Sequence, residues 1–220
     1  MLKFKENLRC FLTQRCPYCG ETTDYIVCCP SCASKLLELV NREYGKTVFC
    51  DRFEAAFIYQ DLVREAVTQF KFHGRPEYVR NFIPILKKCV RSSFDVVLPV
   101  PYYKQEEHKR EYSTSALLAQ YLASALKTTY AKRAVAKVFE TKRQHNLEFD
   151  ERFRNIIGCF SVNPKTVAQK TVLICDDIIT SGATINELAK VCKKAGAIRV
   201  EAVSFAVAPS AFCVNEEKYL

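Results

Sequence analysis

The sequence contains no long run of uncharged hydrophobic residues, no internal repeat and no low-complexity tract. A membrane-spanning helix needs about 18 or more consecutive apolar residues, so none is expected. Charged side chains interrupt residues 1–15, which therefore lack the apolar core of a secretory leader. Hydrophobic residues make up 49% and charged residues 26%, a globular composition that excludes a disordered chain. We expect a cytoplasmic protein without membrane insertion, whose cysteines are thiols or metal ligands rather than disulfides.

Cysteine, in contrast, is abundant, with 12 among 220 residues and half of them within residues 1–32. Two C-x-x-C pairs, at 16–19 and 29–32, have the spacing of the paired knuckles that bind zinc tetrahedrally. A redox C-x-x-C motif is the alternative, but such a motif normally occurs once, beside a βαβ unit. Cys28 leaves an ambiguity, because it would replace Cys29 if the loop shifted by one residue. The predicted ligands of a structural Zn²⁺ are Cys16, Cys19, Cys29 and Cys32.

Apolar runs of strand length alternate with amphipathic segments after the cysteine-rich region. This order is typical of an α/β fold with a mostly parallel sheet flanked by helices. We expect a small N-terminal zinc-ribbon module at residues 1–45 and an α/β domain at residues 50–220. The predicted helices cover 35–40, 62–73 with Asp61 as N-cap, 77–91, 113–126 with Ser113 or Thr114 as N-cap, and 183–195. The predicted strands cover 53–59, 94–99, 159–162, 171–175 and 198–207.

The stretch 171–184, TVLICDDIITSGAT, carries the chemistry. A buried strand there delivers two adjacent carboxylates to the carboxyl edge of the sheet, where open α/β sheets bind ligands. The following loop of hydroxyls and glycine opens a helix and so suits a phosphate group. Two acids that merely cap a helix are the alternative interpretation. The predicted ligand is a sugar with a 5-phosphate and free 2- and 3-hydroxyls, bound by Asp176, Asp177, Thr180, Ser181, Gly182, Ala183 and Thr184.

This stretch resembles the phosphoribosyl pyrophosphate (PRPP) motif of type I phosphoribosyltransferases. Together with the four-cysteine module, the chain is similar to the competence protein F family. Further resemblances are Lys71-Phe72-x-Gly74-Arg75, Leu98-Pro99-Val100-Pro101, Gln144 with Leu147, and Arg152-x-x-Asn155 leading to Gly158-x-Phe160. One departure is the segment 110–114, Arg-Glu-Tyr-Ser-Thr, where this family usually has Arg-Gly-Phe-Asn-Gln.

The resemblance implies a type I phosphoribosyltransferase-like fold that binds PRPP with Mg²⁺. In this fold the loop after the strand at 97–100 holds pyrophosphate, which makes Tyr102, Tyr103 and Lys104 candidate contacts. A solvated charged loop is the alternative for these residues. The resemblance also implies a role in DNA uptake during natural transformation, with DNA-uptake or recombination proteins as partners.

Positive charge is concentrated in the middle of the chain. The formal net charge is +9, and residues 71–143 carry this whole excess, interleaved with aromatic side chains. Cations mixed with aromatics suit single-stranded DNA, although solvated helix faces would produce the same pattern. The candidate nucleic-acid contacts are Lys71, Arg75, Lys109, Arg110, Lys132, Arg133, Lys142 and Arg143.

Two functions therefore remain open. The first is a PRPP-binding protein that acts with single-stranded DNA, with or without turnover. The second is an active phosphoribosyltransferase that transfers ribose 5-phosphate to an unknown nucleobase or amine. The sequence identifies no base pocket and no catalytic residue, and a PRPP-sensing regulator is disfavoured because no helix-turn-helix signal is present.

Overall fold

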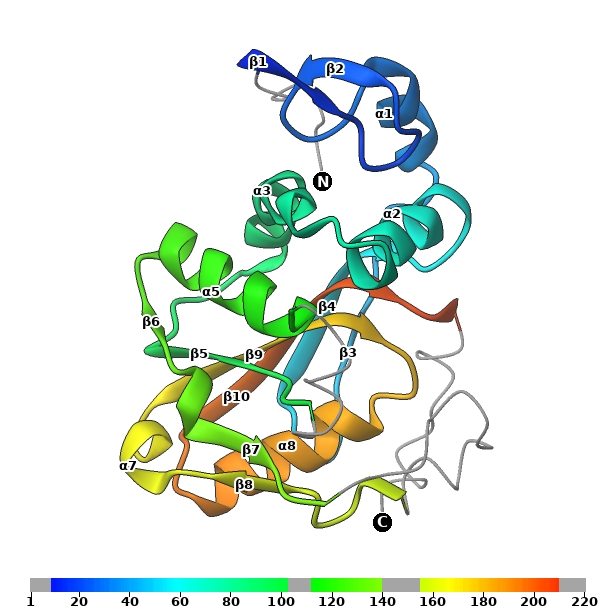
Figure 1. Cartoon of the computed structure of the whole chain (residues 1–220). Helices are drawn as coiled ribbons and strands as arrows, with labels where there is room; N and C mark the ends of the chain where they lie inside the picture. The colour runs from blue at the N-terminus through cyan, green and yellow to red at the C-terminus, as the bar shows by residue number, and fades with distance from the viewer. Residues whose placement is uncertain (1–8, 103–111, 140–154, 210–220) are drawn as a thin grey trace.

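A six-stranded sheet forms the centre of the molecule in the computed structural model, which describes residues 9–102, 112–139 and 155–209 (Figure 1). Its strand order is β3-β4-β10-β9-β5-β6, and every neighbouring pair is parallel except β3 with β4. The buried strands are rich in Val, Ile and Phe, as both faces are covered. The strands are β3 (Tyr44–Gly45), β4 (Arg52–Ile58), β5 (Val96–Pro99), β6 (Thr129–Tyr130), β9 (Thr171–Ile179) and β10 (Arg199–Val207).

Helices cover both faces of this sheet (Figure 1). One face packs against α2 (Asp61–Phe72), α3 (Val79–Cys89) and α5 (Thr114–Leu126), and the other against α8 (Ala183–Lys194). The core is accordingly divided into two apolar clusters, one on each side. Shorter elements complete the fold: η2 (Pro76–Tyr78), η3 (Lys132–Ala134), β7 (Val135–Lys137), β8 (Phe160–Val162) and α7 (Pro164–Val167).

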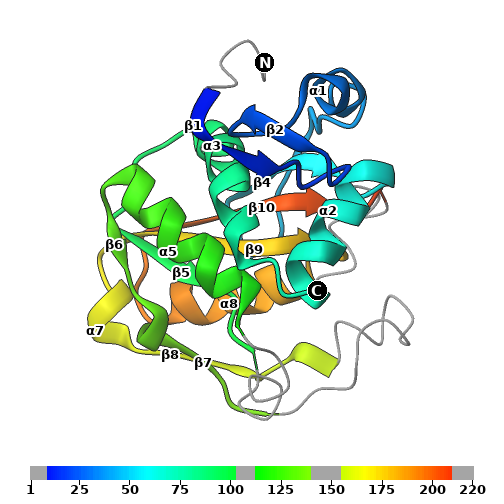
Figure 2. The same cartoon turned by 45° about the horizontal axis from the view of Figure 1, so that its top comes forward.

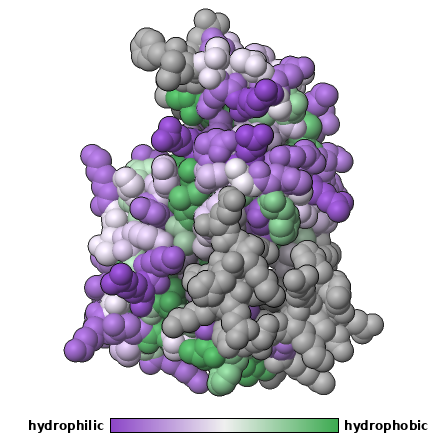
Figure 3. Space-filling view, in the orientation of Figure 1, coloured by the Kyte–Doolittle hydropathy of each residue, from purple (hydrophilic) through white to green (hydrophobic). Residues whose placement is uncertain are grey.

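The N-terminal module lies over α2 and α3, on their side away from the sheet (Figures 1 and 2). It consists of the antiparallel hairpin β1 (Arg9–Arg15) and β2 (Thr22–Tyr25), followed by α1 (Pro30–Leu36). The buried ring of Tyr18 lies 6.5 Å from that of Phe82 on α3, and Phe82 stacks on Phe205 of β10 with 3.9 Å between centroids. The module thus shares its apolar core with the sheet. Hydrophilic side chains cover much of the described surface on the face shown in Figure 3.

The expected fold class is confirmed, and most predicted elements are present within a few residues. The helix predicted at 35–40 is wrong: the helix is α1 at Pro30–Leu36, because Cys29 caps it and Pro30 occupies its first position. Residue Val40 instead bridges to Phe57 of β4. The division at 1–45 and 50–220 stays a prediction.

Two further boundaries differ from expectation. Asp61, expected as an N-cap, is the first residue of α2 with φ of 43°, and the N-cap is Gln60 without a side-chain bond. Strand β9 continues four residues beyond Cys175, because β10 pairs with it as far as Ile179. The two aspartates therefore lie within the strand. None of the helices in the described ranges is both long and apolar enough to cross a membrane.

Candidate functional site

The acid pair Asp176–Asp177 lies near the carboxyl end of β9, beside the ends of β5 and β10. Asp177 is 3% exposed and is surrounded by donors from two helices. The Lys71 ammonium at the end of α2 lies 2.9 Å from Asp177 Oδ1. The Thr114 hydroxyl at the start of α5 donates to Asp177 Oδ2, and the Tyr102 hydroxyl lies 3.5 Å from the same oxygen. Residues far apart in sequence thus meet at one carboxylate.

The two acids have opposite electrostatic states. Burial, followed by the charge of Asp177, raises the pKa of Asp176 above its usual value. Burial alone would also raise the pKa of Asp177, but the Lys71 ammonium and the Thr114 hydrogen bond lower it below the ordinary value. For Lys71, burial opposes the charge, yet Asp177 raises the ammonium pKa above its ordinary value. Burial and the charge of Asp177 raise the pKa of the Tyr102 phenol. The site therefore contains a firm Lys71–Asp177 ion pair beside a carboxyl that protonates readily.

A loop of small and hydroxylated residues connects this strand to α8. Gly182 is its N-cap and has φ of 74°, a left-handed conformation that favours glycine. Ser181 is buried and its Oγ accepts from the Ala183 backbone N–H at 3.4 Å. Thr180 and Thr184 are half-buried at the two ends of the loop. The amino end of a twelve-residue helix and two threonine side chains here suit an anionic group beside the acid pair.

The structure brings together part of the predicted residue set. Tyr102, predicted to contact pyrophosphate, lies at the acid pair. Lys71, predicted to contact nucleic acid, also lies there, in the ion pair with Asp177. Arg75 is exposed and 3.6 Å from Glu77. Outside the described residues lie Tyr103, Lys104, Lys109, Arg110, Lys142 and Arg143.

Sequence reasoning missed the roles of Lys71 and Thr114 as partners of Asp177. Signals for both were present. Lys71 is the first residue of the Lys71-Phe72-x-Gly74-Arg75 segment that resembles the family, and Thr114 is a candidate N-cap beside Ser113. In the structure Ser113 is the cap, accepting from the Ala116 N–H, which leaves the Thr114 hydroxyl to bind Asp177.

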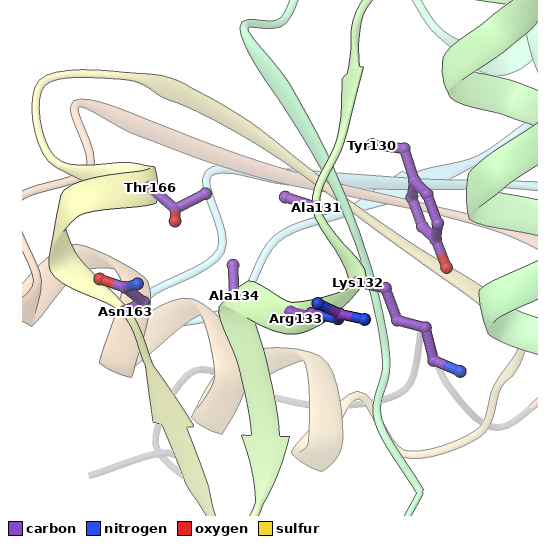
Figure 4. Close-up of a pocket in the computed structure, with 7 residues that line it drawn as sticks. All are labelled: Tyr130, Ala131, Lys132, Arg133, Ala134, Asn163 and Thr166. Atoms are coloured by element: carbon purple, nitrogen blue, oxygen red, sulfur yellow. The ribbon is translucent and has the colours of Figure 1, made fainter.

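Lys132 and Arg133 lie away from the acid pair, on a surface pocket of about 360 Å³ (Figure 4). In Figure 4, Asn163 and Thr166 from the α7 side face the residues of η3. Because α7 immediately precedes β9, this pocket is near the amino end of that strand, opposite the end that carries the acids. The lining residues are Tyr130, Ala131, Lys132, Arg133, Ala134, Asn163 and Thr166.

A second cationic surface, which sequence reasoning did not single out, lies on α3. Arg80, Lys87 and Lys88 are exposed on this helix, whose sequence VRNFIPILKKC contains no acid. The neighbouring α5, TSALLAQYLASAL, has no charged residue and exposes Tyr121. A helix with exposed cations thus neighbours a helix that exposes an aromatic ring, and neither helix contains an acidic residue.

The four predicted zinc ligands form one cluster. The Sγ atoms of Cys16, Cys19, Cys29 and Cys32 all lie within 4.8 Å of one another, and those of Cys19 and Cys29 are 3.6 Å apart. A tetrahedral Zn²⁺ with Zn–S bonds of about 2.3 Å requires sulfurs about 3.8 Å apart, so this donor set fits zinc. Cys28 is buried and is not one of the four clustered cysteines, so the geometry favours Cys29 over Cys28 as the ligand.

Backbone groups support the cluster. Cys29 caps α1, and its Sγ accepts from the Cys32 N–H at 3.5 Å, while the Cys29 N–H donates to Cys16 Sγ at 3.4 Å. Such N–H···S bonds and the helix amino end favour thiolates, the form that binds a metal.

Comparisons with known proteins agree with this architecture. A family model described as "Phosphoribosyl transferase domain" matches residues 113–212. The chain is 26% identical over 199 residues to competence protein F of Haemophilus influenzae, which covers 84% of this chain and 82% of that protein. It is 29% identical over 143 residues to the DNA utilization protein YhgH of Salmonella typhi, covering 61% and 63%. It is 21% identical over 179 residues to competence protein ComFC of Bacillus subtilis, covering 80% and 70%.

Proposed function

We propose that this chain, a relative of the competence protein F family with a phosphoribosyltransferase-like domain, binds PRPP and acts with single-stranded DNA during DNA uptake. The observation that carries the first part is the juxtaposition of an acid pair and a hydroxyl-rich loop at the carboxyl end of β9. Carboxylates accept hydrogen bonds from vicinal sugar hydroxyls, and a helix amino end attracts phosphate. A ribose 5-phosphate offers both groups in one molecule.

In the proposed complex the carboxyl end of β9, where the acid pair lies, faces the ribose, and the loop at 180–184 binds its 5-phosphate. Thr180 and Thr184 supply hydroxyl groups, and Ser181 and Gly182 shape the backbone around the anion. The proposed pyrophosphate contact is Tyr102, with Tyr103 and Lys104 following it in sequence. Mg²⁺ would enter with the pyrophosphate of PRPP and neutralise its charge.

Single-stranded DNA is the proposed second ligand, on account of charge. The exposed cations of α3 lie beside an acid-free helix that exposes Tyr121, which matches a phosphate backbone with stacked bases. The names of the relatives, competence protein and DNA utilization protein, point in the same direction. We further propose that the protein works in the cytoplasm with DNA-uptake or recombination proteins.

The cysteine cluster is proposed to hold one structural Zn²⁺. Four thiolates would close the coordination sphere, so the metal would stabilise the hairpin and α1 without taking part in chemistry. The shared core between Tyr18 and Phe82 would transmit this stability to α3.

An active phosphoribosyltransferase is the alternative. In such a reaction the bond from the anomeric carbon to pyrophosphate oxygen breaks, a bond to an acceptor nitrogen forms, and the acceptor loses a proton. A carboxyl group at the end of β9 would hold the ribose while positive charge develops on its ring, and the oxygen atoms that face the ring would stabilise that transition state.

Calorimetric titration of zinc-loaded protein with PRPP and Mg²⁺ tests the binding site. We expect saturable binding that Asp176→Asn weakens, while Glu38→Gln, an exposed acid-to-amide change, leaves it unaltered. Absence of heat and of competition by ribose 5-phosphate would overturn the proposal. Release of pyrophosphate with nucleobase or amine acceptors would favour the enzyme.

A matched pair of charge reversals tests the DNA surface. Arg80→Glu with Lys87→Glu should weaken single-stranded DNA binding and lower the salt slope by about 0.7 for each phosphate group that the variant no longer neutralises. Lys165→Glu with Lys194→Glu, the same charge change at exposed positions on α7 and α8, should have little effect. Equally weakened binding in both variants would show only a general effect of net charge.

A further inference from the structure

The two adjacent aspartates face opposite sides of the sheet. Side chains alternate along a strand, and in β9 Val172 and Ile174 belong to the core cluster on the α8 side, whereas Leu173 and Cys175 belong to the other cluster. The alternation holds as far as Asp177, whose partners Lys71 and Thr114 lie on helices of the second side, and it breaks only after the acids, since Ile178 packs on that same side and Ile179 on the α8 side. Asp176 therefore lies on the α8 side, with the loop at 180–184, and Asp177 lies on the side covered by α2 and α5.

The acceptor capacity of Asp177 is used within the protein. Its Oδ1 binds the Lys71 ammonium at 2.9 Å, and its Oδ2 accepts from the Thr114 hydroxyl and lies near that of Tyr102. Its side chain is 4% exposed and that of Lys71 is 18% exposed. A ribose hydroxyl would have to displace a buried ion pair to reach this carboxylate, which is costly because both charges would lose their partner.

Asp176 is differently placed. It is half-buried, and its Oδ1 accepts only the backbone N–H of Asp177 at 2.9 Å among the bonds found in the described parts of the chain. Its second oxygen receives no hydrogen bond from the described residues. A ligand hydroxyl can therefore bind Asp176 without breaking an ion pair.

We infer that the acids have separate roles: Asp176 accepts the ligand's hydroxyls, whereas Asp177 is a positioning residue that holds the Lys71 ammonium as the fixed counter-ion of the pair. This inference rests on the proposed function, because it divides the sugar-phosphate site. The Lys71 ammonium offsets the negative charge of the Asp176 and Asp177 side chains, which a divalent cation would otherwise have to do. An anionic sugar phosphate can then approach the acids without Mg²⁺.

The experiment uses zinc-loaded protein and ribose 5-phosphate, a probe without the pyrophosphate that itself binds Mg²⁺. Wild-type affinity should be the same with and without millimolar Mg²⁺. Asp176→Asn should weaken binding about tenfold, the effect of one hydrogen bond to the ligand, with unchanged thermal stability. Lys71→Met should weaken binding in the absence of Mg²⁺ and acquire a dependence on Mg²⁺, while Lys71→Arg should retain Mg²⁺-independent binding. A merely structural role for Lys71 would not create a Mg²⁺ dependence.

Stability supplies a second, ligand-independent measurement. Asp177→Asn and Lys71→Met should each lower the melting temperature. The double variant removes both charges, so its melting temperature should fall by less than the sum of the two single decreases. The exposed pair Arg75–Glu77, with 3.6 Å between Nη1 and Oε1, is the control, because the effects of its two substitutions should be small and additive.

Separate outcomes identify what fails. If wild-type protein binds neither ribose 5-phosphate nor PRPP, the proposed function and the role of Asp176 are both overturned, and the stability cycle still decides whether Asp177 holds Lys71. If wild-type protein binds but Asp177→Asn behaves like Asp176→Asn, with full stability, only the division of roles is overturned. A wild-type requirement for Mg²⁺ with ribose 5-phosphate would overturn the counter-ion role of Lys71.

Discussion

Replacing Lys71 by methionine should destabilise the fold in a pH-dependent way. The change keeps a linear apolar side chain but leaves the Asp177 carboxylate, 4% exposed, without its cation. Removing one partner of a buried ion pair costs about 3–5 kcal/mol. Because the Thr114 hydroxyl still binds Asp177, we expect the lower end of that range, about 3 kcal/mol.

The sign of the pH dependence follows from the pKa of Asp177. In the wild type this pKa is below the unfolded value, so the carboxylate stabilises the fold above about pH 4 and the gain is lost as pH falls through the lowered pKa. Without Lys71, burial and Asp176 would place the pKa of Asp177 above its unfolded value. The penalty of the variant should therefore be largest at neutral pH and shrink toward pH 4. Among the described residues, Tyr102 is the other titratable group whose side chain reaches this carboxylate, and its neighbours along β9, Cys175 and Asp176, interact with it through their charges.

Urea denaturation of zinc-loaded protein between pH 5 and 8 measures this effect, since the midpoint falls with the free energy of unfolding at constant slope. Lys193→Met is the matched control: its partner Asp51 is 44% exposed, so its loss should cost no more than about 1 kcal/mol at any pH. A destabilisation by Lys71→Met as small as that of the control, or equal at pH 5 and pH 8, would refute the reasoning.

Three other substitutions have defined outcomes. Phe82→Ala removes a fully buried ring that stacks on Phe205, and should lower the free energy of unfolding by about 3–5 kcal/mol in urea titration. A loss of about 0.5 kcal/mol or less, as for a surface substitution, would contradict this packing. Cys16→Ser should reduce metal content from one zinc per chain to none in dialysed protein, and unchanged zinc would exclude Cys16 as a ligand. Ser113→Ala removes the N-cap of α5 and should cost about 1 kcal/mol by thermal melting, whereas Ser93→Ala, a loop serine that caps no helix, should cost less.

Local patterns accounted for most of the fold. The apolar runs at β5, β9 and β10 and the helix that ends before Gly196 were evident because burial and periodicity are local properties. The helix predicted at 35–40 is displaced from α1 because the apolar residues Leu36 and Leu37 lie at the end of that helix, whereas its start is determined by the cap at Cys29 and the proline that follows. A capping residue followed by proline was the better signal.

The site was predictable only in part, for a physical reason. The acid pair and its loop are contiguous and so appear as a motif, and the cysteine ligands recur at fixed spacing. The ion pair joins Lys71 and Asp177 across 106 positions, and no local pattern encodes which lysine meets which carboxylate. Only packing of α2 and α5 on the sheet selects that pairing.

The position of β10 has a consequence for synthesis. This strand is the last one in the described part of the chain, yet it lies between β4 and β9. Lys71 follows β4 and Asp177 lies on β9, so the groups that meet at the site belong to portions of the sheet joined only by the final strand. A nascent chain that still lacks residues 199–207 has no continuous sheet to hold them together. Ligand binding should therefore begin only after the ribosome has released this strand, and ligand would stabilise the completed fold alone.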